Sequence, residues 1–133
     1  MQDHQFLKTL PSITNKNERL LGLWFFHISS PIRPITKQEL RFAKELSPRR
    51  NKEYSQARGY TRYALSDLFG VDPLAIPLNA LPGKPPELAD GWGHVSISHC
   101  ADAFIIGWSS KAIGVDIERS DRTININYLG KRL

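Results

Sequence analysis

The sequence contains a single cysteine and no long hydrophobic run. One cysteine, Cys100, cannot form an internal disulfide, which is typical of proteins of the reducing cytosol. The longest apolar stretch, residues 20–28, has the length of a strand and falls far short of the ~18–20 apolar residues of a membrane span. Residues 1–9 lack the apolar segment of a signal peptide. We therefore expect a cytoplasmic protein that does not cross a membrane.

The composition predicts one folded domain with an anionic partner. Hydrophobic residues make up 41% of the 133 residues, which is enough to form a core and argues against disorder. The net charge is +5. Much of the positive charge lies between Arg41 and Arg62, whereas Asp116 and Glu118 lie far along the chain in an apolar setting. This separation predicts a phosphate ligand that is held jointly with a metal ion.

The hydrophobic pattern predicts an α+β fold in which a short antiparallel sheet packs on a long helix. Residues 20–28 are typical of a buried strand. A helix is expected over residues 36–46, where Thr36 and Glu39 have the spacing of a capping box. A longer helix is expected over residues 49–69, because apolar residues recur there at spacings of three and four and a glycine follows.

The second half of the chain is expected to be mostly strand. Residues 94–98 and 103–109 flank a tight connection and are typical of a hairpin, and residues 113–118 are expected to form a third strand. The stretch before them, residues 71–88, is rich in proline and is expected to be an extended loop. Residues 123–133 are expected to begin a helix.

Asp116 and Glu118 are the sharpest local signal for a metal site. They are two residues apart in the third strand, so we expect them on one face while their apolar neighbours face the core. Residues i and i+2 of an extended chain are ~6.5–7 Å apart, close enough for both carboxylates to bind one hard cation. The spacing alone is equally consistent with an edge strand that carries two solvated carboxylates.

Two further motifs carry side chains that suit a phosphate. Ser98 ends the first hairpin strand and His99 falls at the hairpin turn, where a hydroxyl and an imidazole can donate hydrogen bonds. In the motif Gly83-Lys84-Pro85, glycine allows close backbone approach and lysine presents a point charge. Taken alone, each motif is better explained as a polar turn at the surface.

The three motifs occur in an order and at a spacing that resemble those of Sfp-type 4′-phosphopantetheinyl transferases. The resembling segments are residues 83–85, 96–100 and 113–118, and residues 54–62 resemble the arginine helix of that family. The likeness covers roughly residues 20–119. It implies the N-terminal half of the family's pseudo-dimeric α+β fold, in which coenzyme A lies between two similar halves.

The resemblance also implies an activity and a set of ligands. Enzymes of this family transfer 4′-phosphopantetheine from coenzyme A to a serine of an acyl or peptidyl carrier protein, in fatty-acid, polyketide or nonribosomal-peptide synthesis. They release adenosine 3′,5′-bisphosphate. The residues implied to act in catalysis by binding Mg²⁺ are Asp116 and Glu118. The residues implied to bind coenzyme A are Lys84, Pro85, Ser98 and His99, with Arg58 and Arg41 as further candidates.

One motif of the family is not present in this sequence. Family members carry Trp-x-x-Lys-Glu-Ala-x-x-Lys in their second half, where its glutamate completes the magnesium site, and nothing in residues 123–133 resembles it. We therefore divide the chain into a loose N-terminal arm (1–19), an N-terminal subdomain (20–119) and a truncated start of the second subdomain (120–133). Three arrangements remain open: an inactive fragment, a homodimer, or a half that a second polypeptide completes.

Two other functions also remain open. A non-catalytic module that binds coenzyme A or a carrier protein would explain the missing motif. A small basic nucleic-acid-binding domain would explain the basic segment 49–62, but no nucleic-acid signature motif accompanies it. Tyr54 and Tyr60 also belong to a predicted helix rather than to a sheet on which bases stack. We therefore expect no nucleic-acid partner.

Overall fold

The chain has an α+β fold, in agreement with the sequence prediction. The computed structural model describes residues 21–79, 82–111, 113–120 and 123–130, the last two ranges by their backbone alone. Within these ranges, no helix is long and apolar enough to cross a membrane.

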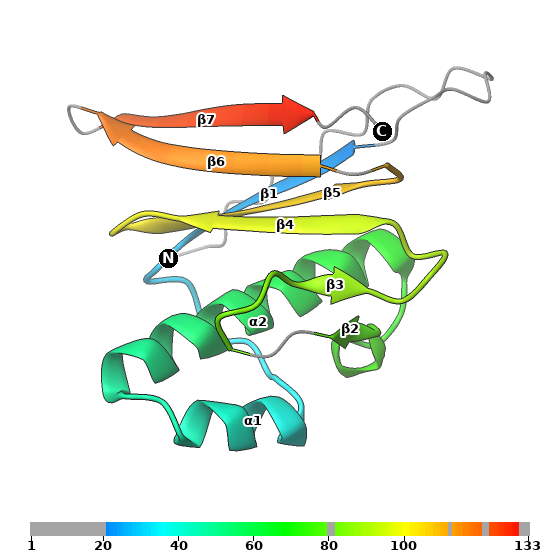
Figure 1. Cartoon of the computed structure of the whole chain (residues 1–133). Coiled ribbons are helices and arrows are strands. Elements are labelled where there is room, and N and C mark those ends of the chain that lie inside the picture. The colour runs from blue at the N-terminus through cyan, green and yellow to red at the C-terminus, as the bar shows by residue number, and fades with distance from the viewer. Residues whose placement is uncertain (1–20, 80–81, 112, 121–122, 131–133) are drawn as a thin grey trace.

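The elements are arranged in layers around one long helix. Helix α2 (Pro48–Phe69) lies beneath a sheet of three strands, and the short helix α1 (Lys37–Lys44) lies on the far side of α2 from that sheet (Figure 1). The segment that follows α2 packs beside it and contains a 3-10 turn, η1 (Pro73–Ala75), and two short paired strands, β2 (Leu78–Asn79) and β3 (Glu87–Leu88). This segment is the predicted proline-rich loop, and it is mostly irregular.

Three antiparallel strands form the sheet, in the order β1–β5–β4. They are β1 (Leu21–His27), β4 (His94–His99) and β5 (Ala103–Ser109), each within a residue or so of its predicted range. The middle strand, β5, is buried along its whole length. Its side chains point alternately to the two faces of the sheet, so both faces are covered here, which explains its nearly continuous apolar sequence.

Both helices begin with side-chain caps. Thr36 accepts a hydrogen bond from the backbone N–H of Glu39, and the Glu39 carboxylate accepts one from the backbone N–H of Thr36, which completes the predicted capping box. Ser47 accepts a hydrogen bond from the backbone N–H of Arg50 at the start of α2. At its other end, α2 is followed by Gly70, whose φ of 68° stops the helix.

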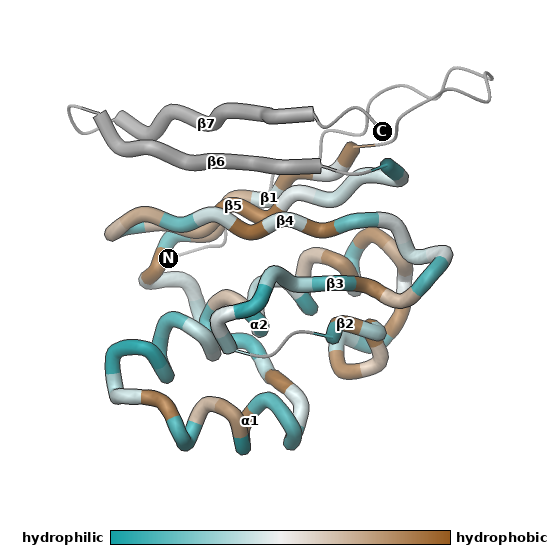
Figure 2. The backbone as a smooth tube through the Cα atoms, in the orientation of Figure 1, coloured by the Kyte–Doolittle hydropathy of each residue, from teal (hydrophilic) through white to brown (hydrophobic). Residues whose placement is uncertain are grey.

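The main hydrophobic core lies between α2 and the sheet. The Phe26 ring of β1 stacks on Tyr60 of α2 with 4.8 Å between centroids, and Tyr60 meets Phe104 of β5 edge-on. Hydrophobic positions recur along the three strands of this sheet (Figure 2). On α1, Ala43 is buried, whereas Leu40 is 48% exposed.

The C-terminal part of the described chain forms a second hairpin and corrects one prediction. Strand β6 (Ile113–Ser120) is the predicted third strand, but β7 (Thr123–Gly130) is a strand where a helix was expected. The two strands are antiparallel, with Ile117 opposite Ile126. Ile124 and Ile126 alternate with asparagines, and this period of two favours a strand over a helix.

Candidate functional site

A pocket of about 340 Å³ lies where α2, the 82–86 loop and the end of the sheet meet. Its walls come from segments that are distant in the sequence. The lining residues that can bind a phosphate are Arg50, Arg58, Lys84 and His99. The pocket therefore brings together three of the residues that the sequence singled out, namely Arg58, Lys84 and His99.

One face of α2 forms a wall of this pocket. The α2 residues that line it are Arg50, Glu53, Tyr54, Ala57 and Arg58. Their spacing of i, i+3, i+4, i+7 and i+8 is that of one stripe along a helix. Arg50 was missed in the sequence analysis, although its spacing from Tyr54 and Ala57 is the signal that could have identified it.

The loop between β2 and β3 contributes Lys84 to the opposite wall. Gly83 has a φ of 81°, a conformation that strains any residue with a side chain, so this turn favours glycine. Lys84 is exposed, and both residues line the pocket. The glycine thus shapes the turn from which the lysine reaches the pocket.

His99 lies at the end of β4, on the sheet side of the pocket. Its imidazole stacks on the ring of Phe104 of β5, with 5.2 Å between the centroids. Phe104 is buried in the core, whereas His99 is exposed. The stacking fixes the ring at the pocket wall and leaves it accessible to a ligand.

Arg58 is the buried charge of this pocket. Arg58 is only 5% exposed, and its Nε has no hydrogen-bond partner in the part of the chain that the structure describes. The carboxylate of Glu53 also lines the pocket, but it pairs with Arg49, at 3.3 Å between Nε and Oε1. A buried charge that lacks an ionic partner is costly. The pocket is therefore suited to an anion.

Tyr54 contacts this buried charge from one helical turn away. The guanidinium carbon of Arg58 lies over the Tyr54 ring, 5.0 Å from its centroid. Burial raises the pKa of Tyr54 above its usual value, and the hydrogen bond and positive charge of Arg58 partly oppose this shift. The phenol therefore stays protonated at neutral pH, and a neutral ring faces the cation.

Three other predicted ligands lie outside this pocket. Arg41 is exposed on α1 and does not line it. Pro85 lines a larger pocket of about 970 Å³, whose walls include residues 85–91 and 94–97. Ser98 lines neither pocket, and strand alternation puts it on the opposite face of β4 from His99.

The side chains of Asp116 and Glu118 lie outside the described residues. Their backbone lies in β6, so the predicted strand is confirmed, with Asp116 opposite Asn127 and Glu118 opposite Asn125. Where side chains are described, no group of three His, Cys, Asp or Glu residues is arranged to hold a metal ion.

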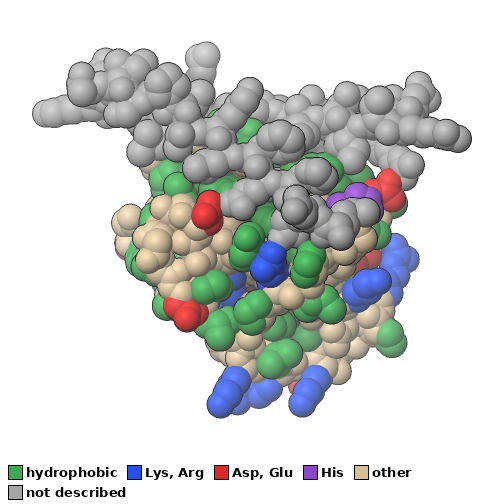
Figure 3. Space-filling view, turned by 180° about the vertical axis from the view of Figure 1, so that it is seen from behind, with side chains coloured by type: hydrophobic (Ala, Val, Ile, Leu, Met, Phe, Trp, Pro, Cys, Tyr) green, Lys and Arg blue, Asp and Glu red, His purple; other side chains and the backbone are tan. Residues whose placement is uncertain are grey.

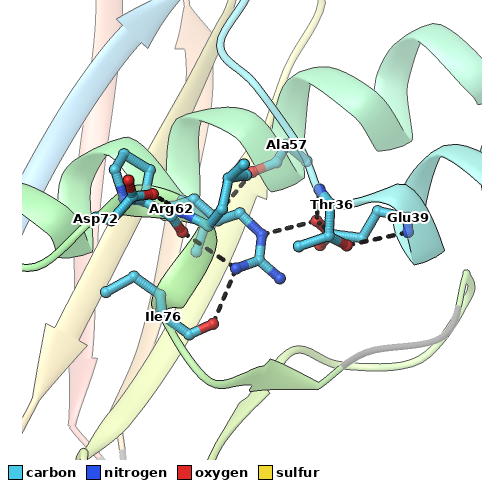
Figure 4. A network of polar contacts seen from close by, with 9 residues as sticks. Thr36, Glu39, Ala57, Arg62, Asp72 and Ile76 are labelled. Carbon is cyan, nitrogen blue, oxygen red and sulfur yellow. Dashed lines mark hydrogen bonds and ion pairs between the residues drawn. The ribbon is translucent and has the colours of Figure 1, made fainter.

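Arg62 has a structural role. The guanidinium is buried, and its Nε donates a hydrogen bond to Glu39 at 2.7 Å (Figure 4). Its Nη1 donates to the backbone carbonyls of Pro73 and Ile76. Arg58 is buried as well, so neither arginine contributes to an exposed basic surface on α2.

The pocket has the chemistry of a phosphate site. Guanidinium, ammonium and imidazole groups are the side chains that donate strong hydrogen bonds to phosphate oxygens.

Comparison of the chain with protein-family models, with curated proteins and with solved structures found no match.

Proposed function

We propose that this chain is the coenzyme A-binding half of a Mg²⁺-dependent 4′-phosphopantetheinyl transferase. The reaction transfers phosphopantetheine from coenzyme A to a serine hydroxyl of an acyl or peptidyl carrier protein. A new phosphate ester forms at the serine, the diphosphate bond of coenzyme A breaks, and adenosine 3′,5′-bisphosphate leaves. The serine proton is released.

The observation that carries this proposal is the pocket around Arg58. Arg58, Lys84 and His99 were selected from sequence motifs as coenzyme A ligands, and all three line one pocket. Arg50 adds a fourth group that can bind phosphate. The burial of Arg58 with an unpaired Nε supports an anionic ligand, because such a ligand would offset the cost of the buried charge.

The magnesium assignment rests on the donor chemistry of β6. Asp116 and Glu118 occupy alternate positions of this strand, and carboxylate oxygens are the ligands that a hard cation prefers. These two residues would hold Mg²⁺, whose chemistry in phosphoryl transfer is to offset the charge that develops on the leaving phosphate. The third carboxylate of the family motif has no counterpart in this sequence, so we propose that the complete site needs a second half.

The test is calorimetry of coenzyme A binding with and without Mg²⁺, together with transfer to an apo carrier protein. We expect coenzyme A to bind and Mg²⁺ to strengthen the binding, without transfer by the chain alone. Addition of a polypeptide that carries the second half should restore transfer. If coenzyme A bound neither with nor without Mg²⁺, the proposal would be wrong.

Two variants test the metal site and the nucleotide contact separately. Asp116→Ala should abolish the strengthening by Mg²⁺, because half of the carboxylate pair is lost, and should leave metal-free binding unchanged. Lys84→Ala should weaken coenzyme A more than dephospho-coenzyme A, since its charge is proposed to contact the 3′-phosphate. If both ligands were weakened equally, Lys84 would not contact the 3′-phosphate and would have to contact another part of the ligand.

A further inference from the structure

We infer that Tyr54 is a positioning residue, which fixes the guanidinium of Arg58 so that its N–H groups are available to a phosphate. This inference rests on the proposed function, because it takes a phosphate of coenzyme A as the ligand. Tyr54 itself needs no contact with that ligand. Its role is to hold the cation in the pocket.

The first observation is the pairing of the two side chains on α2. Arg58 follows Tyr54 by four residues, so the two side chains are neighbours on one helix face. The guanidinium carbon is 5.0 Å from the ring centroid, within the ~6 Å of a cation–π contact. Tyr54 is 8% exposed, and a cation–π contact is stronger where water is excluded.

The second observation is that the carboxylate that lines the pocket pairs with a different arginine. Glu53 lines the pocket, but its bond is with Arg49. The contrast with Arg62 is direct, since Glu39 and two backbone carbonyls hold that guanidinium. A ring contact leaves the edges of a guanidinium open, so the N–H groups that do not bond to the Tyr54 hydroxyl can bind an oxyanion. A carboxylate partner would occupy those same groups.

α2 also supplies a matched control. The guanidinium of Arg33 lies over the Tyr63 ring, 3.8 Å from its centroid, and neither residue lines the pocket. Tyr63→Leu therefore removes the same kind of contact from the same helix without changing the pocket. A general effect on the packing of α2 would appear in this variant too.

The experiment measures the Kd of coenzyme A by calorimetry for Tyr54→Leu, Tyr54→Phe and Tyr63→Leu. Tyr54→Leu should raise Kd about tenfold, because the ring face is lost. Tyr54→Phe keeps a ring face and should stay within about threefold of the wild type, and Tyr63→Leu should behave as the wild type does. Equal Kd values for Tyr54→Leu and the wild type would overturn the inference.

A double-mutant cycle distinguishes positioning from a merely structural role. In an Arg58→Gln background the guanidinium is already absent, so Tyr54→Leu should change Kd by less than about twofold. An undiminished tenfold effect in that background would show that Tyr54 acts independently of Arg58. If wild-type protein does not bind coenzyme A at all, the proposed function fails instead.

Fluorinated phenylalanines at position 54 provide a test that does not depend on the folding of Tyr54→Leu. Each added fluorine weakens the negative face of the ring and barely changes its shape. Kd should therefore rise stepwise from phenylalanine to the trifluoro derivative. A flat series in protein that unfolds at an unchanged temperature would contradict a cation–π role.

Discussion

Arg58 and Arg62 are one helical turn apart and similarly buried, at 5% and 3% exposure, but their neighbours differ. Glu39 and two backbone carbonyls satisfy Arg62, which ties α1, α2 and the following turn together. Arg58 meets the Tyr54 ring and lines a pocket. A buried cation that is satisfied within the protein supports the fold, whereas one with an unpaired donor is available for a ligand.

Arg62→Met should be strongly destabilising. The substitution leaves Glu39 buried without its cation, which typically costs ~3–5 kcal/mol. Urea unfolding followed by circular dichroism measures the free energy of unfolding. In the double variant Arg62→Met/Glu39→Gln the stranded charge is gone and the cap can still form, so part of the loss should be recovered.

The exposed pair on the same helix is the control for that measurement. Arg49 and Glu53 lie four residues apart and are partly solvated. Arg49→Ala should change stability by less than ~1 kcal/mol, because surface ion pairs contribute little. If Arg62→Met and Arg49→Ala lowered the free energy of unfolding by similar amounts, the buried ion pair of Arg62 and Glu39 would matter no more to stability than the exposed pair.

At the scale of elements, α2 is covered on more than one side. The sheet packs above it and α1 below it, so its buried positions extend around the helix (Figure 1). Its sequence contains Gly59 in the interior, although glycine weakens helices. The chain before α1 explains this glycine: a Cβ on Gly59 would lie 2.6 Å from the carbonyl oxygen of Arg33.

Gly59→Ala should therefore destabilise the protein. In an exposed helix the same change would stabilise by ~0.5–1 kcal/mol, but here the added methyl group overlaps a backbone atom, which typically costs ~1–3 kcal/mol. Thermal unfolding is the measurement. Lys52→Ala, at an exposed position of α2, should stay within ~0.5 kcal/mol of the wild type. A more stable Gly59→Ala variant would show that the Arg33 segment moves away at little cost.

At the scale of the whole molecule, the cations on α1 and the cation in the pocket differ in their exposure. Lys37, Arg41 and Lys44 are exposed on α1, and Lys and Arg side chains gather at this end of the molecule in the rear view (Figure 3). Arg58 is enclosed in the pocket instead. An exposed group attracts anions through long-range forces that salt screens, whereas a buried cation is screened much less.

Salt should therefore separate two kinds of anion binding. Random-sequence DNA should bind only at low ionic strength, because its affinity falls steeply as salt replaces the released counterions. Coenzyme A should keep most of its affinity at the same salt concentration. Fluorescence anisotropy of labelled DNA, with coenzyme A as a competitor, measures both. Contacts to phosphates are strongly weakened at about 200 mM salt. DNA binding that persists at this salt concentration would favour the nucleic-acid alternative.

The sequence predicted most elements because their determinants are local. The capping box of Thr36 and Glu39, the glycine after α2 and the apolar strands each act over a few residues. β7 was predicted wrongly: isoleucine alternates with asparagine there, and this period of two favours a strand over a helix.

The candidate site was predictable only in part. Lys84 and His99 were identifiable by motif, since each lies at a turn or a strand end that the local sequence forms. The different roles of Arg58 and Arg62 could not be predicted, because local sequence gives both a place on α2 and only packing gives one of them Glu39. Arg50 was missed, although its spacing from Tyr54 and Ala57 places it on the same stripe of α2. The sequence alone determined the elements and the motifs, through interactions between near neighbours. The tertiary structure decided which cations are satisfied and which face a pocket, because burial and partners come from segments distant in the chain.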